Sequence, residues 1–382
     1  MDVAGLRAET AARQRLKGAR DEPALTALGA TAGVYGSAPA FALSAIARAS
    51  TPLDELDALL GSDRLVRLRC MRGSVYAVPA ALYPTVFAAT QEAVLRDRLR
   101  GLRWAGIAPV EVARLRDAAR EALTGGRAAT IAELRDLLAP LSPEADKHMA
   151  ILASLWAAQG LLVRAGTPTG WRDGAVAYAL AAERLPGIDL EDLDVAAARA
   201  DLARLYLRAF GPATLADFHW WSGLGKRAAR EAMAAALGGE APADDAPVRI
   251  DDPPAADDDG APALRLLPPW DTALVGYRHR ERLVADGHLP WVYDRAGNAA
   301  SVVVRDGLVA GVWQLDDGEP RLVSVAWLPG APAVDPALVE AEAARLAELL
   351  GIAPPGVRVV GVPPPLAEQP RNAHLAPLRG AG

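Results

Sequence analysis

Cysteine is nearly absent from this chain of 382 residues, which carries only Cys70. An internal disulfide is therefore excluded, and we expect a reducing, cytoplasmic environment. Histidine is scarce too, and His219, His279 and His288 lack the spacing of metal ligands. The first residues lack the basic region and apolar core of a secretory signal. The sequence thus predicts neither a metal nor a cofactor.

Charged residues are missing from a stretch of 25 positions, Pro23 to Ala47. Its length would suffice to cross a bilayer. It consists mainly of Ala, Gly, Ser and Thr and holds few Leu or Ile, so its insertion into lipid would be poor. We therefore predict two closely packed helices, residues 22–32 and 38–49, and no membrane partner.

Basic residues are outnumbered overall, with 41 Lys and Arg against 47 Asp and Glu, but the balance is uneven along the chain. Residues 1–239 hold 29 basic against 26 acidic residues, whereas residues 240–382 hold 12 against 21. A surface that binds nucleic acid is therefore expected in the first part.

The stretch Leu65 to Pro79 has the pattern of a β-hairpin. Polar and apolar residues alternate up to Cys70, as in a strand with one buried face. Arg72-Gly73 breaks the run where a turn requires positive φ, and β-prone residues then resume. The polar face would present Arg67 and Arg69, with Arg72 at the tip, and guanidiniums suit phosphate oxygens. A hairpin of this kind after short helices is typical of a winged helix.

Three segments repeat a plan of helices followed by a hairpin or a basic helix. Thr51, Thr130 and Thr214 each precede a carboxylate by three residues, which predicts a capped helix start at each position. Ser222-Gly-Leu-Gly225 before Lys226 has the pattern of a helix-turn-helix. From Leu264 onward short β segments dominate, with Asp306-Gly307 as a hairpin turn.

The predicted fold class is therefore α+β, with tandem winged-helix modules and a C-terminal β-rich domain. The expected divisions are a first winged-helix module, a second one, a third helix-turn-helix module, an acidic linker and the β-rich domain, at residues 1–105, 106–185, 186–238, 239–263 and 264–382.

Several separated motifs resemble the winged-helix DNA glycosylases related to AlkZ. They include Met71-Arg-Gly-Ser-Val-Tyr76, Gly211-Pro-Ala-Thr-Leu-Ala-Asp217, Leu267-Pro-Pro-Trp-Asp271 and Gly276-Tyr-Arg-His-Arg280. The resemblance covers nearly the whole chain. It implies a monomeric, cofactor-independent protein that binds damaged double-stranded DNA in a concave channel. It also implies excision of bulky N7-alkylated purines or unhooking of crosslinks.

The family's catalytic signature is Gln-x-Gln or Gln-x-Asp in the turn between the first two helices. Here Gly33-Val34 is followed by Tyr35-Gly36-Ser37, so the resemblance places Tyr35 and Ser37 at the catalytic positions. An N7-alkylated purine is already cationic and leaves readily, so a catalyst mainly orients water and stabilises the oxocarbenium-like state. A hydroxyl can orient water as an amide does.

Other side chains leave two interpretations open. The wing arginines contact phosphate, together with Ser74, or they pair with Asp54, Asp57 or Asp63 on a solvated face. Tyr76 either contacts DNA or packs inside the protein. Arg278, Arg280 and Arg282 alternate beside Asp271, so they are expected on one side of a strand. There they either contact phosphate or form an ion pair with Asp271. Of Trp220 and Trp221, one is expected in the core and the other at its boundary.

The competing functions are a DNA-binding protein without chemistry, acting in damage sequestration or regulation, and a winged-helix scaffold that contacts protein. Base release from damaged DNA distinguishes the first from an enzyme, and binding to duplex DNA at low salt distinguishes the second.

Overall fold

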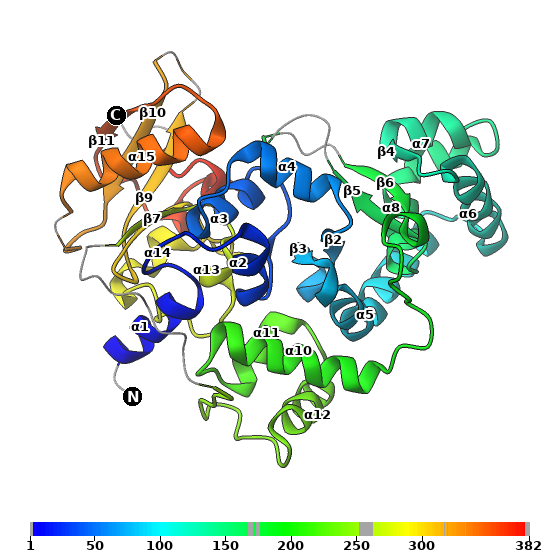
Figure 1. Ribbon diagram of the computed structural model, residues 1–382, viewed down its shortest axis with the longest axis horizontal. Helices are drawn as coiled ribbons and strands as arrows, with labels where there is room; N and C mark the ends of the chain where they lie inside the picture. Colours follow the sequence, from blue (N-terminus) through cyan, green and yellow to red (C-terminus); the bar gives the residue numbers. More distant parts are fainter. Residues whose placement is uncertain are drawn as a thin grey trace.

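The protein folds as a mixed α and β structure with two sheets, which confirms the predicted α+β class (Figure 1). The computed structural model describes residues 3–166, 171–172, 176–251, 263–316, 318, 320–332 and 334–378. The strand order is β1-β3-β2-β5-β6-β4 in one sheet and β11-β10-β9-β8-β7 in the other. The first sheet belongs to the N-terminal half of the chain and the second to the C-terminal part.

A first unit contains the predicted hairpin. Its elements are α2 (Ala24–Ala30), β1 (Val34–Tyr35), α3 (Ala40–Arg48), α4 (Leu53–Gly61), β2 (Leu65–Arg69) and β3 (Val75–Pro79). The turn between the strands is the 3-10 segment η1 (Met71–Gly73), in which Arg72 and Gly73 have φ of 52° and 71°. The predicted cap of α4 is wrong: Pro52 occupies the N-cap position without a side-chain bond. Asp54 and Glu55 instead bring negative charge to the first turn.

A second unit repeats the same order of elements. It consists of α6 (Pro109–Leu123), β4 (Ala128–Thr130), α7 (Ile131–Leu138), α8 (Pro143–Ala158), β5 (Leu162–Ala165) and β6 (Ala177–Leu180). The predicted capping box at Thr130 is confirmed, with Glu133 as its partner. β5 joins β2 through the pair Arg67 and Arg164, so the two units share one sheet. The long helix α5 (Tyr83–Trp104), preceded by the 3-10 turn η2 (Ala80–Leu82), connects them.

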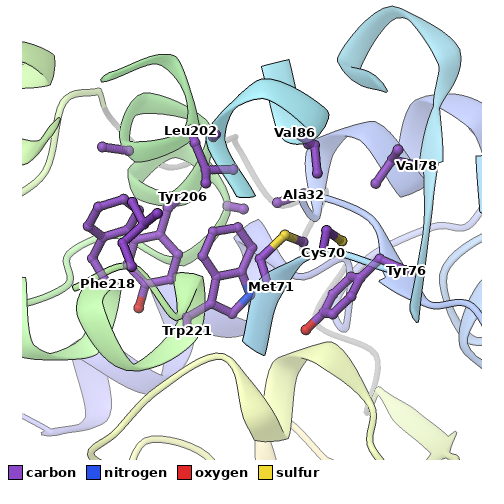
Figure 2. Close-up of a cluster of buried hydrophobic side chains, with 14 of the residues drawn as sticks. Ala32, Cys70, Met71, Tyr76, Val78, Val86, Leu202, Tyr206, Phe218 and Trp221 are labelled. Atoms are coloured by element: carbon purple, nitrogen blue, oxygen red, sulfur yellow. The ribbon is translucent and has the colours of Figure 1, made fainter. Parts of the chain in front are cut away.

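The third segment is helical and packs against the first unit. It holds α9 (Ala181–Arg184), α10 (Val195–Phe210), α11 (Leu215–Ser222) and α12 (Lys226–Leu237). The capping box of Thr214 with Asp217 is confirmed. Met71 and Cys70 of the hairpin share a buried cluster with Trp221 and Tyr206 of this segment (Figure 2). Gly223 has φ of 73°, and a Cβ there would lie 2.9 Å from the backbone nitrogen of Arg72. The glycine therefore permits the hairpin tip to approach α11 closely.

The C-terminal part forms the second sheet and its covering helix. It contains β7 (Leu264–Leu267), α13 (Thr272–Val275), η3 (Asp286–His288), α14 (Leu289–Val292), β8 (Val302–Arg305), β9 (Leu308–Asp316), β10 (Leu322–Trp327), α15 (Pro336–Leu350), β11 (Gly356–Val359), η4 (Leu366–Glu368) and η5 (Ala373–Leu375). The Asp306-Gly307 hairpin turn is confirmed. Helices α15 and α3 bury apolar residues in one core with this sheet, so the first unit and the C-terminal part are packed together.

Two expectations on this part of the chain need comment. Arg278, Arg280 and Arg282 lie in irregular segments rather than on a strand, so the prediction of a shared strand face is wrong. Of the expected acidic linker, residues 252–262 lie outside the described residues. In the described portion, Asp251 accepts a hydrogen bond from Arg13 of α1 (Val3–Arg13) at 2.9 Å. That contact ties the segment to the N-terminal helix.

Candidate functional site

The turn that carries Tyr35 lies directly on the second strand of the hairpin. β1 pairs antiparallel with β3, with Tyr35 opposite Tyr76, and the Gly36 N–H donates to Val75 O at 2.7 Å. A Cβ on Gly36 would lie 2.8 Å from the backbone carbon of Tyr76. Glycine is therefore required beside Tyr35 for the turn to reach the strand.

Tyr35 lines an aromatic cavity of about 200 Å³. The other aromatic lining residues are Tyr76, Trp221 and Trp270, and the polar ones are Arg72, Ser74 and Asn298. The Tyr35 and Trp270 rings are stacked with centroids 5.2 Å apart, and Tyr76 meets Tyr35 edge-on at 6.5 Å. Burial raises the pKa of Tyr76, so its hydroxyl stays protonated at neutral pH. Hereafter this is called the Tyr35 cavity.

Ser37 does not share this position. It is half-buried, and its backbone oxygen accepts a bond from Phe41 N at the start of α3. Within the described part of the chain, Ser37 is not among the residues that line the Tyr35 cavity. The two residues expected at the catalytic positions are therefore separated, and only Tyr35 faces the cavity.

Trp270 is held in a strained conformation by a network that sequence analysis did not identify. Its φ is 57°, which a bulky residue adopts only when its surroundings enforce it. Its Nε1 donates to Asn298 Oδ1 at 3.0 Å, and its backbone N–H donates to Ala299 O. His374 packs edge-on against the indole with centroids 4.8 Å apart. The Tyr35 cavity thus has a wall fixed by residues from the C-terminal part.

Asp294 completes this network. Burial opposes its ionisation, but hydrogen bonds from Asn298 and the nearby His374 ring outweigh that effect and lower the pKa of Asp294. Its Oδ2 lies 3.1 Å from His374 Nδ1. The Trp270 motif was visible in the sequence, but its contacts with Asn298 and His374 cannot be derived from residues so far apart in the chain.

The wing arginines have three different environments. Arg67 is only 4% exposed and donates to Ala165 O at 2.8 Å, so the expected solvent-facing Arg67 is wrong. Arg69 is half-buried and donates to Gly73 O. Arg72 is exposed, with its guanidinium 3.7 Å from the ring centre of Trp220. Among the described residues, none of these arginines forms an ion pair with Asp54, Asp57 or Asp63, although the Asp57 charge raises the pKa of Arg67 slightly against the effect of burial.

Trp220 and Trp221 behave as the sequence predicted. Trp221 is 1% exposed in the core, whereas Trp220 is half-buried at its boundary. Arg280 also approaches the Trp220 ring, at 5.7 Å, so Trp220 receives guanidiniums from both Arg72 and Arg280. A cation-π contact of this kind stiffens long side chains at the edge of the Tyr35 cavity.

Asp271 is a buried structural anchor. Its carboxylate accepts from both terminal nitrogens of Arg48, at 2.7 and 2.8 Å, and from Ser44 Oγ at 2.8 Å. An ion pair of Asp271 was predicted correctly in kind, but its partner is Arg48 rather than Arg278, Arg280 or Arg282. The pair joins α3, which follows the Tyr35 turn, to the loop that carries Trp270.

The three later arginines lie in different surroundings. Arg278 is exposed, Arg280 lies 4.1 Å from the Tyr293 ring centre, and Arg282 lies 4.3 Å from that of Tyr277. Asp217, which is fully buried, accepts from the backbone N–H groups of Arg278 and His279. Only Arg278 and Arg280 are therefore placed to reach a ligand at the molecular surface.

A family model described as DNA glycosylase AlkZ-like matches residues 23–349. The chain belongs to the AlkZ-like DNA glycosylase family. This confirms the resemblance found in the motifs, and membership implies a role in DNA repair with DNA as the substrate. The fold of this AlkZ-like protein is also similar to that of Streptomyces sahachiroi DNA glycosylase AlkZ, with a TM-score of 0.71. That alignment covers 94% of this chain and 100% of the other, at 22% identity. No curated protein matches by sequence.

Two further findings on this AlkZ-like protein concern metal ions and membranes. Among the described residues, no group of three or more His, Cys, Asp or Glu side chains is arranged to hold a metal ion. In the same residues, no helix combines the length and apolarity that a membrane crossing requires.

Proposed function

We propose that this AlkZ-like protein is a monofunctional DNA glycosylase that releases bulky, cationic N7-alkylated purines, and unhooks crosslinks made through such purines, at the Tyr35 cavity. The observation that carries the proposal is the stacked pair of Tyr35 and Trp270 beside Arg72. The substrate would be damaged double-stranded DNA bound by a monomer.

The chemistry requires little from the protein because the leaving group is already activated. The N9–C1′ bond breaks with its electron pair passing to the cationic purine, which leaves as a neutral base. Water adds to the resulting oxocarbenium carbon and loses a proton to solvent. The electron-rich faces of Tyr35 and Trp270 would stabilise both cations, and the Tyr35 hydroxyl would orient the water. Ser37 is proposed as a secondary hydroxyl behind that turn.

The surrounding elements support a DNA-binding role for both units. The order helix, strand, helix, helix, strand, strand occurs twice and is that of a winged helix. We therefore propose tandem winged-helix modules with the divisions expected from the sequence. Arg72, Ser74 and Tyr76 of the first wing, with Arg278 and Arg280, would contact the DNA beside the Tyr35 cavity. Arg69 would contact it through the hollow on the other side of the wing, whereas Arg67 and Arg282 would support these contacts from inside.

The test is incubation with duplex DNA that contains N7-methylguanine or a nitrogen-mustard crosslink, followed by assay of free base and abasic sites. Tyr35→Phe removes only the hydroxyl and should lower the release rate by about 100-fold while leaving DNA affinity unchanged. Ser37→Ala, as the matched loss of a hydroxyl outside the cavity lining, should have a smaller effect. Equal rates for wild type and Tyr35→Phe would contradict the assigned role of Tyr35.

A second candidate is a protein that binds damaged DNA without chemistry. It is favoured by the absence of both family glutamines at positions 35 and 37, which hold Tyr and Ser. Tight binding of alkylated duplex by the wild type with no base release would establish this alternative.

A further inference from the structure

An unusual group of arginines lies where the two units share their sheet. Arg67 of β2 and Arg164 of β5 are direct partners across the strands. Arg69 follows two residues later on the same strand, and its charge interacts unfavourably with those of Arg164 and Arg98. Like charges opposite each other weaken a sheet. This arrangement of like charges therefore destabilises the protein when no anion is bound.

Carboxylates offset little of this charge, and Arg98 pairs with the exposed Asp97. In the described portion of the chain, no Asp or Glu forms an ion pair with Arg67, Arg69 or Arg164. Burial and the neighbouring Arg164 lower the pKa of Arg67 to about 10, and Asp57 offsets this only in part. The Arg67 Nε is buried and has no hydrogen-bond partner. Buried guanidiniums of this kind lack the anion that normally accompanies them.

A groove of about 750 Å³ opens over these arginines. Arg69, Arg98, Arg164, Ser154 and Tyr178 are among the residues that line it, whereas Arg67 is not. Ser154, Arg69 and Arg164 also line a narrow pocket behind the groove that reaches Arg67 and Gln91. The start of α7 borders the groove, but Thr130 and Glu133 already cap its N–H groups. The arginines, rather than the helix terminus, would therefore hold an anion.

We propose that this groove binds a phosphate group through Arg69, Arg98 and Arg164, with the charge of the buried Arg67 behind them. The groove is hereafter called the junction pocket. Planar guanidiniums match phosphate oxygens with paired hydrogen bonds. The phosphate comes either from the backbone of bound DNA or from a free phosphate monoester. Arg69 and Arg98 also line a hollow that reaches Arg72 at the wing tip, so a DNA backbone leaving the Tyr35 cavity passes the pocket. The inference does not depend on base excision.

The first experiment measures thermal unfolding with inorganic phosphate, at ionic strength matched with sodium chloride. The wild-type melting temperature should rise with phosphate and saturate, because a ligand that binds only the folded state stabilises it. Arg164→Gln should lose this rise. Arg103→Gln removes the same charge from an exposed position in the last turn of α5, outside the junction pocket, and should keep it. If Arg164→Gln does not fold, Arg69→Gln provides the same test.

The second experiment identifies the source of the phosphate with undamaged duplex DNA. If the backbone occupies the pocket, Arg164→Gln should weaken binding and reduce the slope of log affinity against log salt by about one. A saturable phosphate effect with an unchanged slope would instead assign the pocket to a free phosphate monoester. The proposal is overturned if Arg164→Gln and Arg69→Gln both keep the phosphate-induced rise in melting temperature and the wild-type salt dependence of DNA binding. This holds whatever the outcome of base-release assays.

Discussion

The two repeated units have the same order of elements, but the Tyr35 cavity lies at the first unit, where residues of the C-terminal part adjoin it. In the first unit, β1 leads through Tyr35-Gly36-Ser37 to α3, and residues from the C-terminal part cover that turn. In the second, β4 passes directly into α7 through the capping box at Thr130, whose Glu133 is exposed. This order of elements therefore does not make a site by itself. The Tyr35 cavity arises where the C-terminal part packs against the turn.

The largest expected effect concerns the ion pair of Arg48 with Asp271, which joins the first unit to the C-terminal part. Asp271→Ala leaves the Arg48 guanidinium, which is 1% exposed, without its partner. Removing one member of a buried pair should lower the free energy of unfolding by about 3–5 kcal/mol. Urea unfolding measures this loss.

The control for that prediction lies in the second unit. Arg135 and Asp146 form a pair at 2.7 Å, with side chains about half exposed at 46% and 49%. Asp146→Ala should cost at most about 1 kcal/mol because solvent screens the pair. Similar losses for the two variants would show that Asp271 does not fasten the first unit to the C-terminal part.

Next in size is the close approach of the Tyr35 turn to β3. Gly36→Ala places a methyl group 2.8 to 2.9 Å from backbone atoms of Tyr76 and Ala77, so the turn must move. We expect a loss of about 1–3 kcal/mol in unfolding free energy and a matching fall in base release. Gly61→Ala, where no atom lies within 4 Å of the added Cβ, is the control and should leave both measurements nearly unchanged.

The sequence predicted the individual elements better than the site. The hairpin at 65–79 and the turn at Asp306-Gly307 occur where they were predicted because their signals are local. Capping boxes at Thr130 and Thr214 were visible for the same reason. Thr51 failed because Pro52 took the N-cap position instead.

The candidate site depended on contacts between distant residues. Tyr35 was found from its place in a family motif, whereas the opposing Trp270, Asn298 and His374 are brought together only by the C-terminal fold. Arg67 was misplaced because a period of two predicts a strand face but does not show that a second unit will cover it. Covering surfaces of this kind have no local signal.

A smaller effect is expected from the cap that replaces the Tyr35 turn in the second unit. Thr130→Ala removes the side chain that accepts from Glu133 N and should lower unfolding free energy by about 1 kcal/mol. Because Thr130 and Glu133 do not line the Tyr35 cavity, base release measured well below the melting temperature should not change. A loss of activity at full folding would show that the second unit contributes to the site.

The smallest expected effect concerns His374 in the layer that covers the first unit. Burial lowers the pKa of His374 below 6.5, and Asp294 only partly opposes this shift. The unfolded chain therefore binds a proton at higher pH than the folded protein, so stability falls as pH drops from 6.5 toward the folded value. His374→Phe should flatten this slope between pH values of about 7.5 and 5.5, measured as the shift of the urea midpoint. The wild type and the His374→Phe variant share the other four histidines, so the titration of these four cancels in the comparison. Parallel slopes would mean that His374 is already charged against Asp294 in the folded protein, and that its contact with Trp270 is that of an imidazolium.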